Sequence, residues 1–181
     1  LKIKIFLRSN LQEINILINK AKLEKRIEEM GKQISKDYEG KELVFVGILK
    51  GSVMFMAELA KHVKNSVQLD FMDVSSYVGT ESSGNIQINK DIRDGIEGKD
   101  VIIVEDIIDT GRTLTYVAEY LKQKNPNSIK IATMLSKPSR RVMELEVDYI
   151  GFAIEDKFVV GYGLDYNEKY RNLPYIGYIE N

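Results

Sequence analysis

The chain has 181 residues, of which 44% are hydrophobic and 29% charged, with 26 basic and 27 acidic side chains and no cysteine. This length suits one domain with a continuous core, and the lack of cysteine excludes disulfides, thiolate zinc sites and a cysteine nucleophile. A single histidine excludes multi-histidine metal centres, and the net charge of −1 gives no general reason to expect nucleic acid or a membrane as partner.

The N-terminal residues 1–8 alternate apolar and basic side chains and contain no long apolar run. A bilayer-spanning helix needs roughly 20 apolar residues, and a secretory signal needs a continuous apolar segment followed by a small-residue cleavage site. Neither is present, so we expect a cytoplasmic protein.

Two helices and a strand are predicted in the first third of the chain. Apolar residues recur every three or four positions from Leu23 to Tyr38, which is the period of an amphipathic helix. The continuous apolar run at 42–49 indicates a buried strand. Lys50-Gly51-Ser52 ends this strand, and helical spacing resumes from Met56 to Val63.

The remaining elements alternate between strands and helices. Strands are predicted at 67–75, 100–106, 129–135 and 147–154, a helix at 114–121, a mobile polar loop at 77–85, and short strands and turns at 158–181. Such alternation predicts a mostly parallel sheet covered by helices, in which ligands bind outside the carboxyl ends of the strands.

One strand end has an unusual arrangement of acidic residues. Glu105 and Asp106 end the strand, Asp109 follows, and the segment 110–113 (Thr-Gly-Arg-Thr) opens a helix. Free amides at a helix N-terminus, hydroxyls and a glycine suit a phosphate. The carboxylates would repel a phosphate unless Mg²⁺ or sugar hydroxyls lay between them, so the residue types suggest a sugar phosphate with a metal nearby. The alternative is an ordinary helix cap and a solvated acidic turn.

The segment 101–114 (Val-Ile-Ile-Val-Glu-Asp-Ile-Ile-Asp-Thr-Gly-Arg-Thr-Leu) closely resembles the phosphoribosyl diphosphate (PRPP) motif of type I phosphoribosyltransferases, and more narrowly that of hypoxanthine-guanine phosphoribosyltransferases. Three further segments, 46–52, 73–77 and 155–168, resemble the family's pyrophosphate loop, mobile loop and purine-binding tail in the same order. The similarity runs from about Ile14 to the C-terminus.

The resemblance implies an α/β fold of the type I phosphoribosyltransferase kind, with a mostly parallel twisted sheet flanked by helices and a small hood formed by the termini. We expect a single domain over residues 1–181, in which residues 1–12 match no part of the family pattern and are an added segment. It also implies purine salvage, in which Mg²⁺-dependent transfer of 5-phosphoribosyl from PRPP to N9 of hypoxanthine or guanine gives IMP or GMP and pyrophosphate. The expected partners are these small molecules and further copies of the chain, as a homodimer or homotetramer, with no nucleic acid or membrane.

The resemblance assigns the acidic residues and the phosphate loop. Glu105 and Asp106 would bind the ribose hydroxyls and Mg²⁺, and Asp165 would help to hold the metal. Asp109 would be the catalytic base that exchanges the N7 proton of the purine. The 5′-phosphate would be held by Thr110, Gly111, Arg112 and Thr113; Arg112 stands where relatives often have lysine.

The remaining assignments concern pyrophosphate, the purine and a lid. Lys50 and Gly51, whose peptide bond can be cis in the family, would contact pyrophosphate together with Arg171. Lys137 would donate to the 6-oxo group, Phe158 would stack on the purine, and Val159 would read its edge through backbone groups. The loop around Ser76 and Tyr77 would close over the site and exclude water.

Each of these residues also has a structural interpretation. Lys50 would otherwise be a solvated lysine at a turn, Phe158 a core residue, and Arg171 a partner in a surface salt bridge.

Two rival functions also remain. One is an RNA-binding regulator on the same fold, whose phosphate motif shares Thr-Gly-Arg-Thr but differs at Asp109 and in the tail. The other is a sister enzyme preferring xanthine or adenine, although Asp109 with Lys137 favours a 6-oxopurine.

Overall fold

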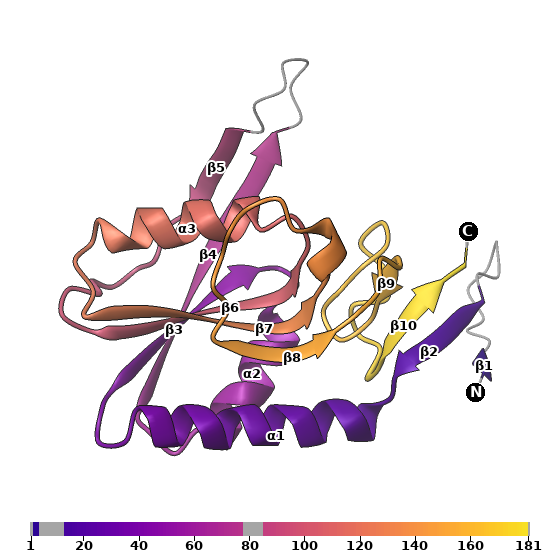
Figure 1. The fold of residues 1–181 in the computed structure, drawn as a ribbon, viewed down its shortest axis with the longest axis horizontal. Helices are drawn as coiled ribbons and strands as arrows, with labels where there is room; N and C mark the ends of the chain where they lie inside the picture. The colour runs from indigo at the N-terminus through magenta and orange to yellow at the C-terminus, as the bar shows by residue number, and fades with distance from the viewer. Residues whose placement is uncertain (1, 4–12, 78–84, 181) are drawn as a thin grey trace.

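The computed structural model describes residues 2–3, 13–77 and 85–180. Its main sheet has the strand order β5-β4-β3-β6-β7-β8 (Figure 1), and all neighbouring strands in it are parallel except β4 and β5. The strands are β3 (Leu43–Leu49), β4 (Val67–Tyr77), β5 (Asn85–Lys90), β6 (Asp100–Ile108), β7 (Ser128–Ser136) and β8 (Tyr149–Ala153). The predicted mostly parallel sheet is therefore confirmed.

Helices cover both faces of this sheet. Helices α1 (Lys20–Asp37) and α2 (Val53–His62) lie on one side and α3 (Arg112–Lys122) on the other (Figure 1), and a short 3₁₀ turn, η1 (Pro138–Arg140), follows β7. Alternation along the central strands explains the two layers. Phe45 and Ile102 pack in the same core cluster as α1 and α2, whereas Val46 and Ile103 pack in the cluster of α3.

A second, smaller sheet joins the two ends of the chain. Its order is β1-β2-β10-β9, formed by β1 (Lys2–Ile3), β2 (Ile14–Ile18), β10 (Ile176–Ile179) and β9 (Val159–Val160), and all its pairs are antiparallel. It lies beyond the carboxyl end of β8 (Figure 1). This sheet is the hood expected from the resemblance.

Three strands, β1, β2 and β5, were absent from the sequence prediction, and several boundaries differ. Strand β1 has only two residues, β2 has five and is interrupted by Asn15, and β5 alternates polar and apolar residues, so none shows the long continuous apolar run that marks a buried strand. Residues Tyr77 and Asn85, placed at the edges of the predicted loop, instead pair with each other as strand ends. The centre of that loop, residues 78–84, lies outside the described residues.

Within the described part of the chain, no helix is long and apolar enough to cross a membrane.

The buried face of α2 gives a direct stability test. Leu59 is completely buried between the helices and the sheet, whereas Leu69 on β4 keeps 47% of its surface exposed. We expect Leu59→Ala to lower the free energy of unfolding by about 2–5 kcal/mol, because it removes packed methyl groups and leaves a cavity. The same substitution at Leu69 is the control and should change it by less than about 1 kcal/mol in urea unfolding. Equal effects at the two positions would contradict this placement of the core.

Candidate active site

The predicted functional residues converge at the carboxyl edge of the main sheet. Strands β3, β6, β7 and β8 are parallel, so the segments that follow them emerge at the same edge, and this edge faces the hood (Figure 1). These segments are residues 50–52 after β3, 109–111 after β6, 137–141 after β7 and 154–158 after β8. Fold topology therefore brings together four loops that are far apart in the sequence.

Three of the expected segments touch through glycines. A side-chain carbon added to Gly51 would lie 1.6 Å from Oδ2 of Asp106, and one added to Gly163 would lie 2.0 Å from the carbonyl oxygen of Gly51. Gly163 also has a φ of +103°, a conformation that L side chains rarely adopt. The loop after β3, the acidic end of β6 and the C-terminal segment are therefore in direct contact.

The two adjacent carboxyls, Glu105 and Asp106, lie at the centre of this contact. Oxygen Oε2 of Glu105 is buried without a hydrogen-bond partner. Burial, with the neighbouring Asp106, raises the pKa of Glu105 well above its usual range, and burial also raises the pKa of Asp106. Hydrogen bonds from Glu105 and from the Ile107 amide (2.6 Å), together with the charge of Arg171, oppose the shift at Asp106. The pair is thus an acceptor site whose hydrogen-bonding capacity the protein leaves unfilled.

The loop between β6 and α3 encloses a small hollow. Residues 105, 107–111, 113 and 114 line a cavity of about 120 Å³. Gly111 precedes the first turn of α3 with a φ of +83°, and the carbonyl of Thr110 accepts hydrogen bonds from the amides of Val142 (3.1 Å) and Met143 (3.2 Å). The amides at the start of α3 border this hollow, which is the arrangement that favours an anion.

A chain of four alternating charges joins the segments after β6, β7 and β8. Asp109 accepts from Arg140 at both carboxylate oxygens, with distances of 2.9 Å from Nε and 3.4 Å from Nη2. Nη1 of Arg140 lies 3.5 Å from Asp156, whose other oxygen accepts from Nζ of Lys137 at 3.1 Å. Asp109 raises the pKa of the Arg140 guanidinium. The predicted base and the predicted purine-binding lysine therefore belong to one network.

A second charged group forms around Arg171. Its guanidinium donates to the carbonyl of Gly163 (2.8 Å) and lies 2.9 Å from Asp165 and 3.4 Å from Glu168. Glu168 also pairs with Lys50 at 3.0 Å, and the Lys50 ammonium lowers the pKa of Glu168. Both cations expected to meet pyrophosphate are thus linked through one exposed glutamate.

The aromatic residue assigned to stacking is not part of the core. Phe158 keeps 47% of its surface exposed, and its ring meets the ring of Tyr166 edge to face at a centroid distance of 5.5 Å. Val159 is buried in β9 and pairs with Tyr178 of β10. An exposed ring supported by a second ring leaves one face available for a planar ligand.

The three carboxylates expected to share a metal are not gathered in one place. Among the described residues, no three acidic, histidine or cysteine side chains lie close enough together to hold a metal ion. Asp165 is engaged instead by Arg171 and by the amide of Glu168 at 2.8 Å. Glu105 and Asp106 do fit a hard cation, because Mg²⁺ is usually bound by one or two carboxylates together with substrate oxygens and water.

Two expectations about the loops also need comment. Ser76 and Tyr77 belong to the end of β4, paired with Ile86 and Asn85, so the proposed lid itself falls on residues outside the described part of the chain. The cis peptide bond joins Leu49 to Lys50, one bond before the Lys50–Gly51 bond considered from the sequence.

The sequence analysis assigned no role to two charged residues that lie in the site. Arg140 and Asp156 are half-exposed charged side chains, a kind that is usually solvated surface. The available signal was position, because Arg140 lies four residues and Asp156 three residues after a strand's carboxyl end on the edge that carries the acidic motif. Proximity to that edge was a better guide than residue type.

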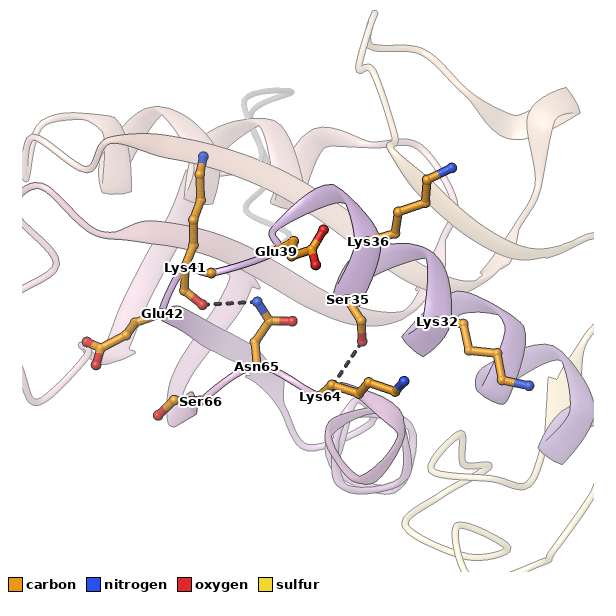
Figure 2. Close-up of a pocket in the computed structure, with 10 residues that line it drawn as sticks. Lys32, Ser35, Lys36, Glu39, Lys41, Glu42, Lys64, Asn65 and Ser66 are labelled. Carbon is orange, nitrogen blue, oxygen red and sulfur yellow. Dashed lines mark hydrogen bonds between the residues drawn. The ribbon is translucent and has the colours of Figure 1, made fainter.

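A larger cavity lies away from this edge. It has a volume of about 670 Å³ and is lined by the C-terminal end of α1, the segment between α1 and β3, and the segment before β4 (Figure 2). Its four lysines include Lys36 in the last turn of α1, where a cation complements the negative end of the helix dipole. The position of Lys36 therefore has a structural explanation.

Comparison with known families agrees with this geometry. Residues 14–167 match the model of the phosphoribosyl transferase domain. The chain belongs to this family of phosphoribosyltransferases.

Comparison with individual relatives narrows the similarity to one group within this family. A hypoxanthine-guanine phosphoribosyltransferase of Staphylococcus aureus (strain Mu50 / ATCC 700699) is 52% identical over 172 residues, covering 94% of this chain and 95% of that protein. The crystal structure of a hypoxanthine phosphoribosyltransferase from S. aureus gives a TM-score of 0.88, with 52% identity over 92% of this chain and 91% of that one. A hypoxanthine-guanine phosphoribosyltransferase of Bacillus anthracis gives a TM-score of 0.89, with 43% identity over 95% of this chain and all of that one.

Some relatives are much longer. The chain is 49% identical to the bifunctional protein TilS/HprT of Listeria monocytogenes over 166 residues, but it spans only 26% of the length of that protein.

The buried carboxyl pair predicts that Glu105 lowers the stability of the fold. We expect Glu105→Gln to raise the free energy of unfolding by on the order of 1 kcal/mol, because a neutral amide avoids a buried charge next to Asp106. The raised pKa of Glu105 means that the wild type loses stability as pH rises above the ordinary glutamate value of 4.5. The difference between the two proteins, measured by urea unfolding, should therefore grow with pH from about this value. Glu119→Gln on exposed α3 is the control, and a Glu105 variant that is less stable at neutral pH would refute the prediction.

Proposed function

We propose that this chain transfers the 5-phosphoribosyl group of PRPP to N9 of hypoxanthine or guanine, releasing pyrophosphate and giving IMP or GMP. The observation that carries the proposal is the network joining Asp109 to Lys137 at the edge that also holds the hollow before α3. A carboxylate and an ammonium held together suit a ring that presents an N7–H donor and a 6-oxo acceptor.

The balanced reaction assigns the proton to Asp109. The N9 lone pair of the purine forms a bond to C1′ of the ribose, while the C1′–oxygen bond to pyrophosphate breaks and its electron pair leaves with pyrophosphate. The purine then sheds its N7 proton, and the Asp109 carboxylate accepts it. Asp109 is half-exposed, so it is accessible to a purine. Lys137 is buried, and its ammonium would donate to the 6-oxo oxygen and so orient the purine for attack through N9.

Charge on the leaving group needs neutralisation from the other side of the site. Lys50 and Arg171 are the cations placed there, and both are at present balanced by Glu168. In the proposal, Glu105 and Asp106 would hold Mg²⁺ or the ribose hydroxyls, and Mg²⁺ would supply further positive charge to the pyrophosphate. The amides and hydroxyls of residues 110–113 would bind the 5′-phosphate, and Phe158 would stack on the purine.

The rival functions differ in what they require at these positions. A regulator that binds RNA needs phosphate contacts spread over a surface, but it has no need of a carboxylate and a lysine joined in one network. Adenine has an amino group instead of a 6-oxo group, so an adenine-specific enzyme would not need a lysine ammonium at the position of Lys137. A xanthine-preferring enzyme remains the nearest alternative.

The proposed assembly is a homodimer or homotetramer.

One assay tests the proposal against its rivals. The purified protein should form nucleotide from PRPP and Mg²⁺ with hypoxanthine or guanine, with weak or no product from adenine. The strongest turnover with xanthine would replace the proposal by its nearest alternative. Salt-sensitive RNA binding without any nucleotide formation would favour the regulator.

Substitution of the base tests the proton transfer. We expect Asp109→Asn to lower turnover by about 10²–10⁴-fold, the usual contribution of a positioned general base. The affinity for PRPP in the absence of purine, measured by calorimetry, should stay the same, since the 5′-phosphate contacts come from other residues. Undiminished turnover in this variant would rule out Asp109 as the base.

A further inference from the structure

We propose that Arg140 is a positioning residue that fixes the Asp109 carboxylate and, through Asp156, ties it to Lys137, so that both purine-reading groups move as one unit. This inference rests on the proposed function, because it describes how the same site selects and orients its purine. The sequence analysis assigned no role to Arg140 or to Asp156, although Asp156 lies in the segment 155–168 that resembles the purine-binding tail.

The first argument is the geometry of the ion pair. Nε and Nη2 of Arg140 each reach a different oxygen of Asp109, so the plane of the carboxylate is set by the plane of the guanidinium. A single contact would leave the carboxylate free to rotate, whereas a forked contact restrains it. A base must meet N7–H within hydrogen-bonding distance and along a lone pair, so restraining its plane has a kinetic effect.

The second argument is that the contact leaves room for the substrate. Each carboxylate oxygen has two acceptor positions, and Arg140 uses one on each. The purine N7–H can therefore donate to Asp109 while Arg140 stays in place. The third nitrogen of the guanidinium, Nη1, donates to Asp156, and Asp156 also accepts from Nζ of Lys137.

The third argument is that this pair contributes little to folding. The side chains of Arg140 and Asp109 are 49% and 42% exposed, and ion pairs at such positions add little to stability in water. A purine bound over the pair would displace water and strengthen the contact. The arrangement therefore has its main effect when the ligand is bound.

Arg140 also has a short, stiff connection to Lys137. The turn η1 begins at Pro138 and places Arg140 three residues after the lysine, with the amide of Arg140 donating to the carbonyl of Lys137 at 3.1 Å. The amide of Lys137 in turn donates to the carbonyl of Ile108, the residue before Asp109, at 2.9 Å. The backbone thus links the same two residues that the side chains link.

A double-mutant cycle tests the inference. Arg140→Ala should lower kcat/KM for hypoxanthine by about 10- to 100-fold, the scale expected when a reacting group is displaced by a fraction of an ångström to an ångström. In the Asp109→Asn background the same substitution should have a much smaller effect on the residual rate, about twofold, because the forked contact to the Asp109 carboxylate is already altered and only the longer contact to Asp156 is lost. The KM for PRPP and the thermal unfolding midpoint should be unchanged in both backgrounds.

Arg93→Ala is the matched control, since Arg93 is exposed and remote from this network, and it should change none of these values. Calorimetric binding of IMP gives a readout that does not depend on turnover, and Arg140→Ala should weaken it. An equal loss in both backgrounds, an unchanged rate, or a faster rate from a base released by the substitution would each overturn the inference. If the wild-type protein makes no nucleotide from any purine, the proposed function fails instead.

Discussion

The contact between Gly51 and Asp106 is the constraint on which the site depends. No side chain fits between them, and Gly163 closes on Gly51 from the other side. The loop after β3, the acidic end of β6 and the segment after β9 are therefore fixed relative to one another by backbone packing. Hydrogen bonds and ion pairs around Arg171 then refine an arrangement that close packing has already set.

Energetically, the site combines a strained centre with weak surroundings. The Glu105–Asp106 pair has unmet acceptor capacity and a raised pKa, features that cost stability and mark a place prepared for a ligand. The ion pairs at its rim, such as Lys50–Glu168, are exposed and easily exchanged for a substrate. Under the proposed function, ligand binding would supply partners to the carboxyl oxygens of Glu105 and Asp106 and would break only weak, exposed ion pairs at the rim.

Much of this was predictable from the sequence, for identifiable reasons. The buried strands and amphipathic helices were found because continuous or periodic apolar runs reflect their surroundings directly. The acidic motif was found because carboxylates rarely end such a strand. Strands β1, β2 and β5 were missed because none contains a long continuous apolar run, and because β2 pairs with β10, which is far away in the sequence. The link from Asp109 to Asp156 was missed because it depends on which loops share an edge.

The hood has a consequence for how the domain is made. Strand β10, residues 176–179, lies between β2 and β9 and hydrogen-bonds to both, so it is an interior strand of the small sheet. During translation, β10 is synthesised after all the other helices and strands of the described residues. The main sheet contains no strand from beyond residue 153 and can pack earlier, whereas β2 and β9 have no shared partner until synthesis reaches β10. The segment carrying Phe158 and Arg171 would then gain its final support only once β10 has been synthesised, when the strands of the main sheet are already available.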